Sequence, residues 1–129
     1  MARFWIVTAA LLAGLAVAAG SFGAHGLKSL LEATGRGDNW ETAVRYGMYH
    51  ALAMLAIGLA AGLPQAAAAR GQLAAAGWCF LAGTIIFSGC LAALALSGVR
   101  VLGAIVPIGG VLFLIGWALL AAAALRMKD

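Results

Sequence analysis

Residues 4–24, FWIVTAALLAGLAVAAGSFGA, form an apolar run that contains no charged side chain. An α-helix needs about 20 such residues to cross a hydrocarbon core about 30 Å thick. Arg3 and the segment Phe22-Gly23-Ala24 also resemble the start and the cleavage site of a signal peptide. The run exceeds the usual apolar length of a signal peptide, about 7–15 residues. We therefore expect residues 4–24 to be a membrane-spanning helix.

Three further runs have the length and apolar character of membrane spans, and they cover residues 40–63, 73–96 and 101–125. Pro64 ends the first of these runs, and Ser97-Gly98 predicts a tight turn that makes the other two an antiparallel hairpin. Pro107 predicts a kink or a loosened first turn in the last run. Residues 1–129 are thus predicted to be one domain of an all-α membrane protein, a four-helix transmembrane bundle with both termini on one side.

The composition excludes an ordinary soluble domain. Of 129 residues, 65% are hydrophobic and only 9% are charged, and the mean hydropathy is +1.06. A soluble domain carries about 25% charged residues, so this chain could not cover a core of its own with polar side chains. The net charge of +4 comes from basic residues scattered singly, which provides no patch for nucleic acid.

The orientation in the membrane is weakly marked, because basic residues divide equally between the two sides of the predicted bundle. Arg3 precedes the first span, and Arg126 and Lys128 follow the last one. Loops rich in Lys and Arg remain in the cytoplasm. On that ground we expect cytoplasmic termini.

The only long polar stretch, residues 25–41, predicts a short amphipathic helix at the membrane interface followed by a turn. It carries three leucines on one helical face, and Lys28 and Glu32 are an oppositely charged pair four positions apart. Asp38 or Asn39 is expected to cap the next helix at its start.

The segment 40–50, WETAVRYGMYH, is the place where polar side chains enter a predicted span. At about 100° per residue, several of them fall on one stripe of the helix. Polar groups are costly at membrane depth, so this stripe is expected to face the bundle interior. The stripe comprises Thr42, Tyr46, Tyr49, His50 and Ala53, with Glu41 and Arg45 paired along its edge.

The residues leave several functions open. His25 and His50 are candidate ligands for a metal or a haem, but His50 has no acidic residue near it in sequence, and interhelical packing is the preferred role. A quinone or a lipid headgroup is a further candidate ligand, bound by His50 with Tyr46 or Tyr49. We expect no cofactor and favour a packing partner or a binder of lipid or another small ligand.

A small-solute channel or carrier acting as an oligomer is the alternative class. Proton-coupled carriers place an ionisable residue near mid-membrane, whereas the runs 4–24, 73–96 and 101–125 contain no charge. An enzyme is not expected, because the chain has no catalytic triad, metal motif or phosphate-binding loop. Ser88 lacks an activating base in sequence and is expected to bond to the helix carbonyl four residues earlier.

Several short strings together resemble one family. They are GSFGAHGL at 20–27, WETAVRY at 40–46, MYHAL at 48–52, FSG at 87–89, GAIVPIGG at 103–110 and GW at 116–117. In this order they resemble the bacterial inner-membrane family of domain of unknown function 423, which is related to eukaryotic transmembrane protein 256. Cys90 departs slightly from the family, which often has serine there. The resemblance implies four spans in the bacterial plasma membrane and carries no activity.

The candidate site is one polar cluster, near the side of the membrane on which the link between the first two predicted spans lies. The expected partners are membrane lipids, with a second copy of the chain or another membrane protein as alternatives, and no nucleic acid. The candidate residues are His25, Glu41, Arg45, Tyr46, Tyr49, His50, Ser88 and Pro107.

Overall fold

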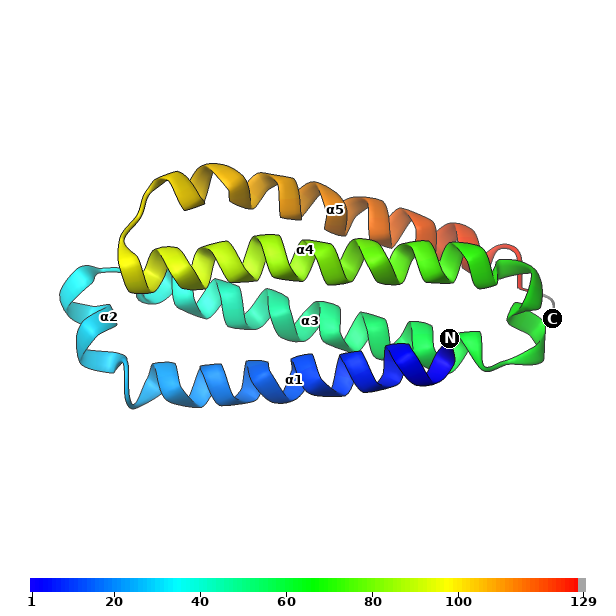
Figure 1. The fold of residues 1–129 in the computed structure, drawn as a ribbon, viewed down its shortest axis with the longest axis horizontal. Helices are drawn as coiled ribbons and strands as arrows, with labels where there is room; N and C mark the ends of the chain where they lie inside the picture. Colours follow the sequence, from blue (N-terminus) through cyan, green and yellow to red (C-terminus); the bar gives the residue numbers. More distant parts are fainter. Residues whose placement is uncertain (128–129) are drawn as a thin grey trace.

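Four long helices run lengthwise beside one another (Figure 1). In the computed structural model, which describes residues 1–127, each is long and apolar enough to cross a membrane, so the four predicted spans are confirmed. The chain enters α1 and leaves α5 at the same end of the bundle (Figure 1). The elements are α1 (Ala2–Ala24), α2 (Lys28–Thr34), α3 (Gly37–Ala61), the 3₁₀ helix η1 (Pro64–Ala69), α4 (Arg70–Ser97) and α5 (Val101–Ala124).

The long helices pack in the order α1, α3, α4 and α5. Glycines permit the close approaches, because without a side chain the backbones can nearly touch. A Cβ atom on Gly58 of α3 would lie 2.7 Å from Cγ1 of Ile6 in α1. A Cβ atom on Gly109 of α5 would lie only 2.6 Å from the backbone nitrogen of Phe87 in α4 and 3.0 Å from the carbonyl oxygen of Gly83.

The largest fully buried side chains come from α1, α3 and α4. Trp5 of α1 covers Gly77 of α4, where an added Cβ would lie 2.5 Å from the indole. Dispersion between closely packed atoms, rather than transfer out of water, holds helices together in lipid. These side chains form a core that holds the three helices together. Its residues are Trp5, Met54, Ile57, Leu73 and Phe80.

The first link contains the predicted amphipathic helix, α2, with Leu31 buried and the Lys28–Glu32 ion pair formed at 3.9 Å. The predicted cap is wrong. The N-cap of α3 is Arg36, no side chain caps that end, and Asp38 lies within the first turn. At that position the negative charge of Asp38 still interacts favourably with the positive end of the helix dipole.

Arg36 also ties the link to α4. Its guanidinium Nη1 donates to the carbonyl oxygens of Ala95 at 3.1 Å and Leu94 at 3.4 Å. The last carbonyls of a helix lack partners within the helix, so this contact gives the Ala95 carbonyl a partner, while the Leu94 carbonyl also accepts from the Gly98 N–H at 2.8 Å. It also explains why α3 begins earlier than predicted, because the chain is already fixed at Arg36.

The predicted hairpin between α4 and α5 is confirmed, with Gly98 in the left-handed region at φ 73°. Pro107 lies inside an uninterrupted α5. At the start of α5 two backbone hydrogen bonds span three residues instead of four. They run from Leu102 N–H to the Val99 carbonyl and from Gly103 N–H to the Arg100 carbonyl. Such three-residue spacing is the 3₁₀ type.

Candidate functional site

His50 lies in the middle of α3 and is 4% exposed. Its ring stacks on Phe113 of α5, with ring centroids 3.4 Å apart and planes 3° from parallel. Nδ1 lies 2.8 Å from the carbonyl oxygen of Tyr46, one turn earlier in the same helix. The indole nitrogen of Trp117, also on α5, lies 3.2 Å from Nε2. One histidine side chain thus connects α3 to α5.

These contacts define the tautomer of His50. The indole N–H of Trp117 can only donate a hydrogen bond, so Nε2 must accept it. The proton of the neutral ring is then on Nδ1, which donates it to the Tyr46 carbonyl. Both ring nitrogens are therefore engaged within the protein, and neither offers a lone pair to a metal or a haem.

A cavity of about 750 Å³ lies beside this contact, between α3 and α5 and above Phe87 of α4. We call it the aromatic groove. Its rings approach one another closely, for example Tyr46 and Phe87 with centroids 4.8 Å apart. The lining residues are Tyr46, Tyr49, His50, Leu52, Phe87, Pro107, Gly110, Val111, Phe113, Leu114 and Trp117.

The only two tyrosines of the chain stand at this groove. Tyr46 is 38% exposed and Tyr49 is 51% exposed, so the prediction that the whole stripe faces the bundle interior is wrong for both. Within residues 1–127 neither hydroxyl makes a hydrogen bond. The reason is geometric, because α3 turns His50 and Ala53 toward the core and the tyrosines toward the gap beside α5.

The structure brings together four of the predicted site residues: Tyr46, Tyr49, His50 and Pro107. The other four lie elsewhere. Glu41 and Arg45 are exposed and form the predicted ion pair with each other. His25 is exposed at the C-cap of α1. The predicted single cluster is therefore too large.

Ser88 belongs to a second cavity, of about 300 Å³, between α1 and α4 over the floor of α3. We call it the α1–α4 groove. The predicted bond from Ser88 to its own helix is wrong, because its Oγ has no partner within residues 1–127. Thr84, one turn earlier, is also without a partner there. A Cβ atom on Gly47 would lie 3.6 Å from the Oγ of Ser88, an ordinary contact distance, so α3 packs beside this buried hydroxyl.

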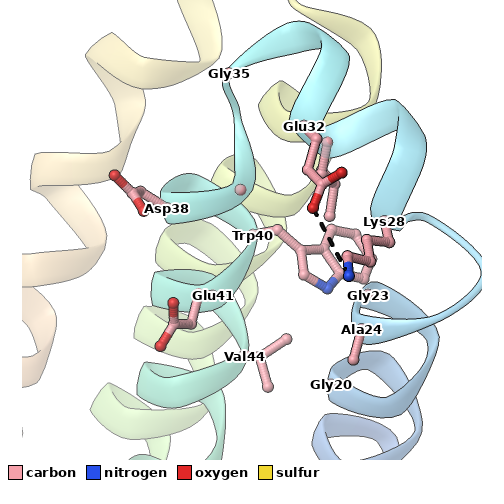
Figure 2. A pocket seen from close by; sticks show the side chains of 12 residues that line it. Gly20, Gly23, Ala24, Lys28, Glu32, Gly35, Asp38, Trp40, Glu41 and Val44 are labelled. Atoms are coloured by element: carbon pink, nitrogen blue, oxygen red, sulfur yellow. Dashed lines mark ion pairs between the residues drawn. The ribbon is translucent and has the colours of Figure 1, made fainter.

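A third cavity, of about 570 Å³, lies under α2 at the end of the bundle. Figure 2 shows Trp40 and Val44 projecting between α3 and α1, while Asp38 and Glu41 point to the other side. Lys28 and Glu32 pair with each other above it (Figure 2). Its charges do not converge on one point, and in residues 1–127 no three His, Cys, Asp or Glu side chains form a metal site.

Several groove residues were missed by the sequence prediction. Phe113 and Trp117 are the direct contacts of His50, and Phe87 forms the floor beside Tyr46. When a helix is apolar on every side, its sequence does not distinguish the face that packs in the bundle from the face that meets lipid. The direction of an aromatic ring on such a helix therefore cannot be predicted. The four-residue spacing of Phe113 and Trp117 was the one available signal, because it puts both on one face of α5.

Together, the spans and the grooves between them define a polytopic α-helical membrane protein. The family of the chain follows from its similarity to known sequences. The chain belongs to the family described as protein of unknown function (DUF423), whose model matches residues 19–110.

Relatives extend this similarity over nearly the whole chain. The UPF0382 membrane protein of Staphylococcus epidermidis is 46% identical over 124 residues, which cover 96% of this chain and 97% of the relative. The UPF0382 membrane protein YwdK of Bacillus subtilis is 39% identical over 128 residues, with 96% and 98% covered. No solved structure shows significant similarity to the chain. The family model and these relatives confirm the resemblance to the family of domain of unknown function 423 that was inferred from the sequence motifs.

Proposed function

We propose that this protein is a non-enzymatic membrane protein that binds a lipid-soluble small molecule in the aromatic groove. The ligand is a flat ring that carries acceptor oxygens, as a quinone does. The observation that supports this most is that Tyr46 and Tyr49 both line the groove and that neither hydroxyl has a hydrogen-bond partner in residues 1–127.

The position of Tyr49 along α3 is unusual for a tyrosine of a membrane-spanning helix. Tyr49 is twelve residues from each end of α3, which places it about 18 Å along the axis from either end. Tyrosines of membrane proteins usually lie near the headgroups, where water or lipid oxygens satisfy the hydroxyl. A hydroxyl that meets only hydrocarbon loses that partner at a cost of about 1–3 kcal/mol. A ligand oxygen in the groove would restore it.

The walls of the groove suit a ring. Aromatic side chains favour offset or edge-to-face contacts with other rings, and Phe87, Phe113 and Trp117 provide such surfaces. The volume lies within the range of about 300–1,000 Å³ that is typical of small-molecule sites. No charged side chain lines the groove, which favours a neutral ligand.

His50 has a positioning role in this proposal. Because both of its nitrogens bond within the protein, it cannot bind the ligand while Trp117 stays in place. It holds Trp117 and Phe113 as one wall of the groove. The ligand's oxygens are bound by Tyr46 and Tyr49.

Binding can be measured by fluorine NMR of protein labelled with fluorotryptophan in lipid nanodiscs, because Trp117 lines the groove. We expect duroquinone to shift the Trp117 resonance saturably. Durene, which has the same ring without oxygens, should need about tenfold more ligand per lipid, as expected for a lost hydrogen bond. Tyr49→Phe or Tyr46→Phe should weaken duroquinone binding by a similar factor, also about tenfold at most.

The matched control is Ser88→Ala, which removes a hydroxyl outside the aromatic groove and should leave the Trp117 titration unchanged. Resonances of Trp5 and Trp78 report non-specific partition, because neither residue lines the groove. Equal binding of duroquinone and durene, or tyrosine variants that bind as the parent does, would overturn the proposal.

A further inference from the structure

Basic side chains are divided equally between the two ends of the bundle, but acidic side chains are not. The end with α2 carries four basic and three acidic side chains, a net charge of +1, and its acidic residues are Glu32, Asp38 and Glu41. At the opposite end, residues 1–127 contribute three arginines and no acidic residue. Lys128 and Asp129, which lie outside the described residues, have charges that cancel. Most of the positive charge is therefore concentrated at one end.

The three arginines mark the end of the bundle at which the chain enters α1 and leaves α5. Figure 1 shows that α4 begins at this end as well. The neighbours of these arginines in sequence, Ala2, Ala69 and Met127, belong to one packed apolar cluster. We call the three the terminal arginines, and they are Arg3 at the start of α1, Arg70 at the start of α4 and Arg126 just after α5.

All three terminal arginines are exposed. Within residues 1–127 none of them makes an ion pair or a side-chain hydrogen bond. At the other end, Lys28 and Arg45 each form an ion pair, and Arg36 donates to carbonyl oxygens of α4. The terminal arginines therefore offer guanidinium groups to an anion from outside the bundle.

Apolar surface lies directly beside these charges. Phe4, Val7 and Leu11 project from one face of α1 and are 46%, 49% and 70% exposed. Trp78 of α4 is 56% exposed, and its ring centroid is 5.6 Å from that of Phe4. Exposed aromatic rings are typical of the boundary between headgroups and hydrocarbon. An anion at Arg3 thus has an apolar surface next to it that acyl chains can cover.

We infer that the end of the bundle with the terminal arginines binds anionic phospholipids such as phosphatidylglycerol. The guanidinium groups donate to the phosphate, whose oxygens match the two parallel N–H groups of an arginine. The acyl chains lie along the exposed faces of α1 and α4. Free phosphate would not use these faces, and the amine of a zwitterionic lipid would bring a positive charge that the arginines repel.

This surface is separate from the aromatic groove, which no charged side chain lines. The inference therefore does not depend on the function proposed for the groove. Binding of a quinone and retention of an anionic lipid can each fail without the other.

Native mass spectrometry of the protein released from detergent micelles measures the lipid preference. Phosphatidylglycerol and phosphatidylethanolamine with the same acyl chains are added in equal amounts. A basic residue near a membrane surface favours anionic lipid by about fivefold, so we expect the bound lipid to be enriched in phosphatidylglycerol by about tenfold or more. The triple variant Arg3→Gln, Arg70→Gln, Arg126→Gln should bind both lipids alike. Each single replacement should lower the ratio by about twofold to fivefold.

The matched control is the triple variant Lys28→Gln, Arg45→Gln, Arg100→Gln, which removes the same charge from the other end. It should keep most of the preference for phosphatidylglycerol. Circular dichroism in the same micelles shows whether a variant is folded, and the single replacements decide the result if the terminal triple variant does not fold.

Four outcomes would overturn the inference. The parent protein could retain both lipids alike, or the two triple variants could lose the preference equally. A folded variant of the terminal arginines could bind lipid as the parent does. Inorganic phosphate in excess could displace the phosphatidylglycerol, which would show that the surface binds phosphate without acyl chains.

Discussion

Replacement of Gly109 by alanine is expected to lower the free energy of unfolding by about 2–3 kcal/mol, near the upper end of the usual cost of overpacking. The new Cβ would lie 2.6 Å from the backbone nitrogen of Phe87 and 3.0 Å from the carbonyl oxygen of Gly83. Backbone atoms inside a helix cannot move aside as a flexible side chain can. The variant must therefore push α5 away from α4, the helix on which α5 mainly packs.

The neighbouring glycine provides a matched control. A Cβ on Gly110 would lie 3.9 Å from the ring of Phe87, an ordinary contact distance. Alanine is favoured over glycine in a helix by up to about 1 kcal/mol, so Gly110→Ala should leave stability unchanged or raise it. Both variants can be unfolded with SDS in mixed micelles and followed by circular dichroism. Equal effects at positions 109 and 110 would contradict the close crossing of α4 and α5.

His50→Ala is expected to lower the free energy of unfolding by about 2–4 kcal/mol, the range for removal of a large buried side chain together with a buried hydrogen-bond acceptor. The change deletes the ring stacked on Phe113 and leaves the indole N–H of Trp117 without its acceptor. Because α3 and α5 meet through these side chains, we expect the loss to fall on the attachment of α5.

The second histidine serves as its control. His25 is exposed at the end of α1, and substitutions at such positions change stability by about 0.5 kcal/mol or less. His25→Ala should therefore unfold at the same SDS fraction as the parent. If both histidine variants lose the same stability, the bridging role of His50 is wrong.

The spans could be predicted because lipid imposes a simple requirement on sequence, a charge-free run of sufficient length. The first link was predicted for a similar reason, since Lys28 and Glu32 mark the only polar helix. The hairpin at Gly98 followed from local turn chemistry. The start of α3 was missed because Arg36 bonds to carbonyls of α4, a contact between residues far apart in sequence.

The arrangement of the candidate site could be predicted only in part. Tyr46, Tyr49 and His50 were recognised because they are polar inside an apolar helix. Their directions were not, because a helix that is apolar on most sides gives little contrast between core and lipid. The contact of Phe113 with His50 could not be predicted for the same reason. Ser88 was assigned to the wrong cavity because no sequence pattern showed which side of α4 faces α1.

The residues that pack against the glycines could not be predicted from the sequence either. Gly58 belongs to a GxxxG pattern, which predicts close packing without naming the partner. The structure places it against Ile6 and places Gly109 against Phe87. In a chain with 18 glycines, such partners emerge only from the three-dimensional arrangement.

The proposed site depends above all on His50 being a neutral structural residue, which leaves ligand binding in the aromatic groove to the tyrosines. Nitrogen NMR of isotope-labelled histidine in nanodiscs tests this directly, with the His50 signals assigned by their absence from His50→Ala. At neutral pH we expect a proton on Nδ1 and a bare Nε2 that accepts from Trp117. A proton on Nε2, in either the other neutral tautomer or the charged ring, would contradict that role.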